Sequence, residues 1–471
     1  MTAPRGIEGL AKNEKSKLLA DLKAKAQNRR ERDGDEPAML ETAPVGPRAF
    51  DFSTMPQHKQ LRMMAAAAEL SGIANPFFHV HEGRAGATTL CGNRTLLNFA
   101  SYNYLGLNGH PEVSAAAKAA IDRYGTTVSA SRLVAGERPI HHELEMALAR
   151  LHGTEDAVVF VSGHATNVST IGHLMGPKDL ILCDALSHNS IVEGTRMSGA
   201  TRLMFAHNDL DALEEHLTRT RSRHERCLIV VEGLYSMDGD MPDLKRLVNI
   251  KRRHDAWLMV DEAHSAGVLG AHGRGLAEEQ GVDPNEIEIW MGTLSKSFAA
   301  AGGYIAGSHA LIEILKAGAP GFVFSVGFPP ALAGAAIKSI ELLEREPWRA
   351  QKIRTNAKLF LELCREAGLD TGTAINAAVV PVIIGDSTSA VMCANRLYEA
   401  GVNVLPIIFP AVPEKQARLR FFITAEHDEA QIRETVAIVD REIRQMRTEM
   451  PAWKRLAGGG WPASTPQRQD L

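Results

Sequence analysis

Between residues 95 and 330, short apolar runs alternate repeatedly with helix-length segments, and this alternation limits the possible folds. Helix-length segments at 167–174, 188–198 and 243–253 separate several of the runs. Alternation of this kind is typical of a mostly parallel sheet that is covered by helices on both faces. Seven runs have the length and the largely aliphatic composition of strands: 157–161, 180–183, 203–205, 227–231, 257–260, 287–291 and 303–306.

The pattern changes after a helical stretch at residues 330–344, which indicates a second, smaller domain. Helices expected near 348–367 and 390–400 alternate there with apolar runs at 378–384, 402–408 and 419–423. We therefore expect an α/β protein with five parts: a charged, flexible or helical extension (1–50), an N-terminal segment (51–95), a large domain (96–330), a small C-terminal α+β domain (331–450) and a flexible tail (451–471).

Composition argues against several classes of protein. A net charge of -4 and a pI near 6.5 disfavour nucleic acid as the main partner. The five cysteines form no C-x-x-C pair, so neither a disulfide framework nor a metal site is predicted. No apolar run approaches the roughly 18–20 residues of a membrane-spanning helix, and the N-terminus lacks a signal peptide's apolar core. We expect a cytoplasmic protein, with peripheral association with a membrane as the alternative.

Polar and reactive residues follow the ends of several predicted strands. In an open parallel sheet, ligands bind beyond the carboxyl ends of the strands, so these residues are expected to line one site. In chain order they are Ser162, Gly163 and His164; Asp184 and His188; Glu232, Ser236 and Asp240; Asp261 and His264; and Thr293, Ser295 and Lys296.

Taken together, these residue types match an aldehyde cofactor held as a Schiff base. A lysine amine such as that of Lys296 forms an imine when burial and neighbouring groups lower its pKa. A carboxylate such as Asp261 keeps a pyridine nitrogen protonated, which makes the ring an electron sink. The helix start after Ser162 offers N–H groups to a phosphate. Taken singly, each residue has a commoner structural explanation, as a helix cap, a structural histidine or a solvated lysine.

Seven motifs occur along the chain in this order: NFASYNYLGL, SRLVAGERPIHHELE, SHNSIVEG, EGLYSMDGD, VDEAHSAGVLGAHGRG, GTLSKSFAAAGG and RLRFFITAEHD. They run from about Asn98 to His427 and resemble those of the α-oxoamine synthases, a family of fold-type I enzymes that use pyridoxal 5′-phosphate (PLP). The resemblance implies a PLP-dependent acyltransferase that condenses a small amino acid with an acyl thioester and releases carbon dioxide. It also implies a homodimer with shared active sites.

The resemblance also implies roles for individual residues. Lys296 would carry PLP and move the Cα proton, Asp261 would pair with the pyridine nitrogen, and His264 would bond the ring hydroxyl oxygen. His188 would stack on the ring. The phosphate would be held by Gly163, His164 and Thr293, and by Ser325 from the neighbouring subunit. Arg420 would bind the substrate carboxylate, assisted by Asn103 and Ser236. For His427 and Arg132 a structural role is as well supported, and at His164 the family usually has Phe or Tyr.

The YNYLG sequence around Asn103 is most like that of serine palmitoyltransferase within the family. It favours L-serine and a long-chain acyl thioester, on CoA or an acyl carrier protein, giving 3-ketosphinganine for sphingolipid biosynthesis. Two alternatives stay open: an 8-amino-7-oxononanoate synthase using alanine and a pimeloyl thioester, and a carrier-protein-fed synthase of a secondary metabolite. An aminotransferase fits the motifs after Asp261 less well, and Lys296 argues against a non-catalytic partner subunit.

Overall fold

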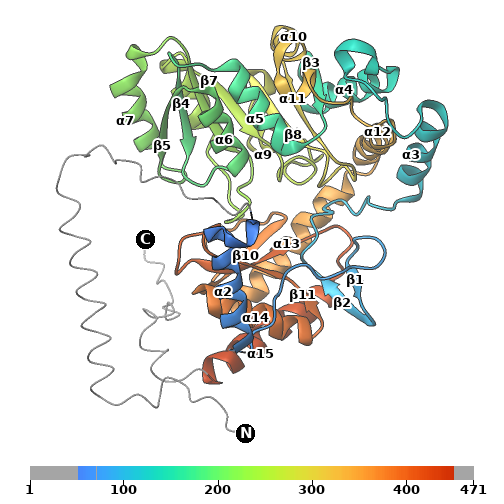
Figure 1. Ribbon diagram of the computed structural model, residues 1–471, viewed down its shortest axis with the longest axis vertical. Helices are drawn as coiled ribbons and strands as arrows, with labels where there is room; N and C mark the ends of the chain where they lie inside the picture. The colour runs from blue at the N-terminus through green and yellow to red at the C-terminus, as the bar shows by residue number, and fades with distance from the viewer. Residues whose placement is uncertain (1–50, 71, 450–471) are drawn as a thin grey trace. The chain divides into compact units, whose positions relative to one another are not determined.

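The computed structural model describes residues 51–70 and 72–449, and Figure 1 shows their helices and strands. The expectations for residues 1–50 and 451–471 lie outside the described residues. The described residues 51–70 belong to one compact unit and residues 72–449 to another. In the first unit, the Asp51 side chain caps the short helix η2 (Phe52–Thr54), and α2 (Pro56–Leu70) begins at a proline.

The second unit contains a mixed seven-stranded sheet, which is the core of the large domain. Its strand order is β3-β9-β8-β7-β6-β4-β5. Strand β9 pairs antiparallel with β3 and β8, and the other neighbours run parallel. The predicted strands are confirmed, with small shifts at their ends: β3 (Asp156–Phe160), β4 (Leu180–Asp184), β5 (Thr201–Phe205), β6 (Cys227–Glu232), β7 (Trp257–Asp261), β8 (Ile289–Thr293) and β9 (Gly303–Gly307).

Both faces of this sheet are covered, as successive residues of one strand show. In β6, Leu228 and Val230 belong to one buried apolar cluster, and Ile229 and Val231 belong to another. A fully buried side chain of this size contributes about 1.5–3 kcal/mol. The covering helices are α3 (Pro111–Tyr124), α4 (Pro139–His152), α5 (Gly163–Leu174), α6 (Asn189–Ser198), α7 (Leu210–Thr220), α8 (Leu244–Arg253), α9 (Leu276–Gln280), α10 (His309–Gly318), α11 (Pro320–Val323) and α12 (Pro330–Arg345), with the short turns η3 (Arg132–Gly136), η4 (Arg221–Arg223) and η5 (Pro284–Glu286).

The C-terminal part carries a three-stranded antiparallel sheet of order β10-β13-β12 around a third apolar cluster. The apolar run predicted at 402–408 is not one strand: it is divided between two sheets. Its first part pairs in parallel with a strand from the N-terminal side, a long-range pairing that local periodicity does not encode. The elements are β1 (Thr88–Cys91), β2 (Arg94–Asn98), α13 (Trp348–Glu366), β10 (Val379–Gly385), α14 (Ser387–Glu399), β11 (Val402–Asn403), β12 (Leu405–Ile407), β13 (Ala417–Phe422) and α15 (Glu429–Glu449).

The five cysteines are buried free thiols. Within residues 51–70 and 72–449, no helix is both long and apolar enough to cross a membrane.

Candidate active site

A cavity of about 520 Å³ opens at the carboxyl ends of the parallel strands. Strands β6, β7 and β8 end there in Glu232, Asp261 and Thr293. Strand β13 of the small domain adds Arg420 and Phe422 to the opposite wall. Most of the predicted site residues therefore meet in one place: Gly163, His164, His188, Ser236, Asp261, His264, Thr293, Lys296 and Arg420 all line the cavity.

Two predicted site residues lie elsewhere. Asn103 lines a neighbouring cavity of about 490 Å³, which shares Lys296 with the first. Its amide is already engaged, donating to the Ala85 carbonyl at 2.9 Å and accepting from the Asn108 N–H at 3.1 Å. Ser325 is half-buried and is not among the residues that line either cavity.

Arg132 and His427 are structural residues in this fold. Arg132 lies buried between the carboxylates of Glu137 and Glu145. The His427 ring stacks on Phe99 at 4.1 Å, and its Nδ1 accepts from the Thr424 N–H at 3.0 Å. Neither residue lines the cavity.

The start of α5 forms a polar cradle at one end of the cavity. Ser162 caps the helix, since its Oγ accepts from the Ala165 N–H at 3.4 Å. The Thr293 hydroxyl bonds Ser295 Oγ at 2.8 Å close to Gly163. A Cβ added at Gly163 would lie 2.9 Å from Thr293 Oγ1. The start of the helix therefore has room for glycine but not for a residue with a side chain. A helix N-terminus flanked by hydroxyls suits a phosphate.

A hydrogen-bonded chain orients the buried carboxylate of Asp261. Asn167 Nδ2 donates to Asp261 Oδ2 at 2.8 Å and to Ser190 Oγ at 2.9 Å. Ser190 Oγ in turn bonds His188 Nδ1 at 2.7 Å. Asn167 and Ser190 were not predicted, because each lies inside a helix and only helix packing brings it toward the strand end.

The amine of Lys296 and the carboxyl of Glu232 have shifted pKa values. Burial lowers the pKa of Lys296 to about 8, although Asp261 and Glu232 oppose this shift. Burial raises the pKa of Glu232 to about 8, and the nearby Asp261 adds to the effect. Glu232 also accepts from the His188 N–H at 2.7 Å. A lysine that is partly neutral near physiological pH is a competent nucleophile and base.

His264 is a neutral imidazole held by a tyrosine. The Tyr104 hydroxyl lies 2.7 Å from His264 Nδ1, and both side chains are buried. Burial keeps the pKa of His264 well below its ordinary value, with a further contribution from the charge of Lys296. A neutral imidazole carries one proton on one of its two nitrogens, so Nδ1 either donates to the Tyr104 hydroxyl or accepts from it.

Arg420 presents an incompletely bonded guanidinium to the cavity. Its Nη1 donates to the Ser236 carbonyl at 3.1 Å, and its Cζ lies 4.7 Å from the centre of the Phe422 ring. Its buried Nε has no hydrogen-bond partner among the described residues. An arginine keeps its charge even where burial lowers its pKa, as happens here. The free donor therefore fits the carboxylate of an amino acid.

These groups fit PLP. The cradle at α5 matches its phosphate, Asp261 its pyridine nitrogen, and Lys296 its aldehyde. Glu232, Tyr104 and Asn167 complete the site, and for the last two the signal emerges only from their contacts in the folded chain.

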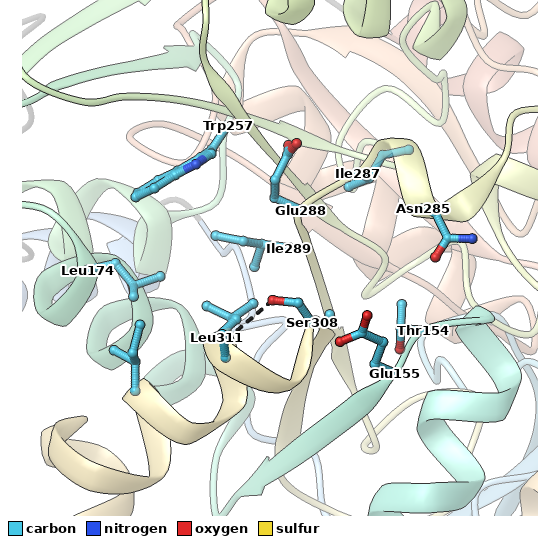
Figure 2. A pocket seen from close by; sticks show the side chains of 13 residues that line it. Thr154, Glu155, Leu174, Trp257, Asn285, Ile287, Glu288, Ile289, Ser308 and Leu311 are labelled. Atoms are coloured by element: carbon cyan, nitrogen blue, oxygen red, sulfur yellow. Dashed lines mark hydrogen bonds between the residues drawn. The ribbon is translucent and has the colours of Figure 1, made fainter.

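A separate cavity of about 460 Å³ lies at the opposite edge of the sheet, where β7 and β8 begin. Figure 2 shows Leu174, Trp257, Ile289 and Leu311 around it, together with two carboxylates. Those carboxylates already accept hydrogen bonds: Glu155 from the His309 N–H and Glu288 from the Leu258 N–H, both at 2.8 Å. This cavity shares no lining residue with the one at the carboxyl ends of the strands, so the two are distinct.

Residues 94–439 match the family described as aminotransferase class I and II. The 8-amino-7-oxononanoate synthase of Pseudomonas putida is 40% identical over 354 residues, which cover 74% of this chain and 89% of that protein. The enzyme of the same name from Geobacter sulfurreducens is 41% identical over 361 residues, covering 76% and 92%.

Among solved structures, a serine palmitoyltransferase from S. paucimobilis with bound PLP is similar, with a TM-score of 0.81 and 30% identity. The similarity covers 84% of this chain and 100% of that one. The matched span contains the cavity and its PLP-compatible groups. The chain therefore belongs to the aminotransferase class I and II family and, within it, to the PLP-dependent α-oxoamine synthases.

Proposed function

We propose that the protein condenses L-alanine with a pimeloyl thioester, with loss of carbon dioxide, to form an 8-amino-7-oxononanoate-type α-amino ketone. The single observation that carries the reaction class is the convergence of Lys296, Asp261 and Arg420 on one cavity. The choice of substrates is supported by sequence relatives of that name at 40–41% identity.

The expectation of L-serine, drawn from the YNYLG motif, becomes the second candidate. It is supported by the structural similarity to serine palmitoyltransferase, which has a TM-score of 0.81 but only 30% identity. In that case the acyl donor would be a long-chain thioester and the product 3-ketosphinganine.

When bound, PLP supplies an electron sink for the negative charge that develops at the amino acid Cα. Lys296 would hold its aldehyde and take the Cα proton, since its lowered pKa leaves part of the amine neutral near pH 8. Asp261 would keep the ring nitrogen protonated, with Asn167 fixing the carboxylate. The remaining cofactor contacts would come from His264 at the ring hydroxyl, His188 at the ring face, and Gly163, His164 and Thr293 at the phosphate.

Substrate positioning falls to Arg420. Its unpartnered Nε and its second Nη would bind the two oxygens of the amino acid carboxylate, while Nη1 stays on the Ser236 carbonyl. Ser236, in the same cavity, and Asn103, in the neighbouring cavity that also contains Lys296, would assist. The acyl thioester would be delivered by CoA or by an acyl carrier protein.

A homodimer with shared sites is part of this proposal. Ser325 lies between Phe324, which is 85% exposed, and Val326, which is 46% exposed. The neighbouring segment exposes Leu133 and Val134, and the Gly327 N–H joins the two segments by donating to the Ala130 carbonyl at 2.9 Å. Exposed apolar side chains on two segments joined in this way favour association, which would bring Ser325 to the site of the partner subunit.

The test uses purified protein saturated with PLP. L-Alanine, L-serine and glycine are titrated separately while the visible absorbance is followed. Pimeloyl-CoA or palmitoyl-CoA is then added, and the carbon dioxide and the product mass are measured. We expect a saturable response and turnover with L-alanine and pimeloyl-CoA, and neither with the Lys296→Ala variant. Turnover with L-serine alone would replace the first candidate by the second, and a protein that retains no PLP would refute both.

A further inference from the structure

An ionic cluster of two buried aspartates and a partly exposed histidine lies behind the active-site loop at residues 233–240, outside the lining of the cavity. The Nδ1 of His207 lies 2.9 Å from Asp184 Oδ1, and its Nε2 lies 3.1 Å from both Asp240 oxygens. Ionised carboxylate oxygens accept hydrogen bonds and donate none. Both ring nitrogens therefore donate, so His207 is an imidazolium that bridges two carboxylates.

The cluster ties together three strand ends of the large domain. Asp184 ends β4, His207 follows β5, and Asp240 closes the loop that follows β6. The two aspartates are almost inaccessible, with exposed fractions of 1% and 7%. Strands β4 and β5 lie side by side at one edge of the large-domain sheet (Figure 1). The imidazolium thus fastens the far end of the loop to that edge.

The small domain holds the same loop from its other side. Thr373 Oγ1 donates to Asp240 Oδ2 at 2.8 Å, and the Ile375 N–H donates to the Gly239 carbonyl at 3.0 Å. Gly239 has a φ of 70°, and a Cβ there would lie 2.1 Å from the Val379 carbonyl oxygen. The loop backbone therefore has no room to shift toward β10.

The loop also carries the protein acceptors of the arginine that faces the cavity. The Ser236 carbonyl accepts from Arg420 Nη1 at 3.1 Å, and Met237 Sδ lies 3.5 Å from the same atom. The Met237 carbonyl accepts from Arg418 at 3.0 Å. Displacement of this loop would therefore change the orientation of the Arg420 guanidinium.

We propose that His207 is a positioning residue for amino acid binding, which acts through the 233–240 loop on Arg420. This inference rests on the proposed function of the same site. Without the imidazolium, two buried carboxylates would face each other and repel, which would loosen the loop. Although burial opposes it, hydrogen bonding to Asp184 and Asp240 raises the pKa of His207 to about 10, so the bridge is intact at neutral pH. Tyr235, whose ring centre lies 4.5 Å from that of His207, is a further titratable group that faces the imidazole.

The first test replaces the charge while keeping a donor, in the variant His207→Gln. We expect the KM for the amino acid to rise about tenfold or more, with kcat within about threefold and the KM for the thioester unchanged. Hydrogen exchange should quicken at the loop amides of Tyr235 and Gly239, which bond within the loop. The control is His272→Gln, which removes an exposed imidazole paired with Glu278 and should alter neither readout.

A double-mutant cycle separates positioning from general destabilisation. If His207 acts through Arg420, the combined loss of affinity in His207→Gln/Arg420→Lys should be smaller than the product of the single losses. Multiplicative losses would contradict the inference, as would unchanged loop exchange or a fall in kcat at constant KM. Should His207→Gln fail to fold, Thr373→Val removes the bond to Asp240 from the small domain and should raise the same KM. A wild-type protein that does not respond to any amino acid would refute the proposed function, whereas the exchange comparison would still decide the role of His207.

Discussion

The titration of Lys296 in PLP-free protein is the sharpest quantitative test of the site. Burial lowers the pKa of this amine to about 8 from an ordinary value of 10.5. At pH 7.5 roughly a quarter of the Lys296 amine would be neutral, against about 0.1% for an ordinary lysine. The neutral fraction, and with it the nucleophilicity that the proposed chemistry needs, is therefore about 200-fold larger than in water.

Competitive acylation over a range of pH, read by peptide mass spectrometry, measures this pKa directly. Lys296 should be half-reactive near pH 8, whereas exposed Lys178, whose pKa the hydrogen bond to Glu225 raises, should react only at higher pH and serves as the internal reference. Because the Asp261 carboxylate stabilises the charged amine, Asp261→Asn should lower the midpoint further. A Lys296 midpoint above pH 10, or an upward shift in the Asp261 variant, would refute the electrostatic reasoning.

Three further predictions concern affinity and stability. Arg420→Lys keeps the charge but loses the fork, so the KM for the amino acid should rise about 10- to 100-fold in steady-state kinetics, and an unchanged KM would exclude carboxylate binding there. Tyr104→Phe leaves the buried His264 Nδ1 without its partner and should lower the free energy of unfolding by about 1–3 kcal/mol in denaturant titrations. The control Tyr102→Phe, at a residue that is 42% exposed, should change the free energy of unfolding little. The pKa of His207 is higher in the folded than in the unfolded chain, so its contribution is complete below about pH 6.5 and lost as the pH rises through about 10. The stability difference between wild type and His207→Gln should therefore shrink from pH 7 to pH 10, and a difference that grows with pH would contradict the imidazolium assignment.

The large domain was predictable because its signal is local. Runs of aliphatic residues separated by helices encode a covered parallel sheet, and a parallel sheet brings the ends of its strands to one edge. Asp261, Thr293 and Lys296 therefore could be placed in one site before any contact was known, and the structure brings them together. The run at 402–408 is not one strand, because its first part pairs with β2, which is distant in sequence, and its second part pairs with β13 in another sheet.

The residues that hydrogen-bond the predicted site residues could not be predicted in the same way. Asn167 lies 94 positions from Asp261, and Tyr104 lies 160 positions from His264. Asn103, which the resemblance places in the site, lines the adjoining cavity, where its amide bonds two backbone groups.

The succession of strands along the chain, the residues at their ends and the family chemistry are thus readable from the sequence, because periodicity and collinear motifs are properties of neighbouring residues. The side chains that orient the reacting groups are visible only in the folded protein. Asn167 bonds Asp261, Tyr104 bonds His264, and His207 lies behind the loop whose carbonyl accepts from Arg420. These contacts depend on distances between residues that are far apart in the sequence. A hydrogen bond forms only when two atoms come within about 3 Å, and the packing of the whole domain sets that distance.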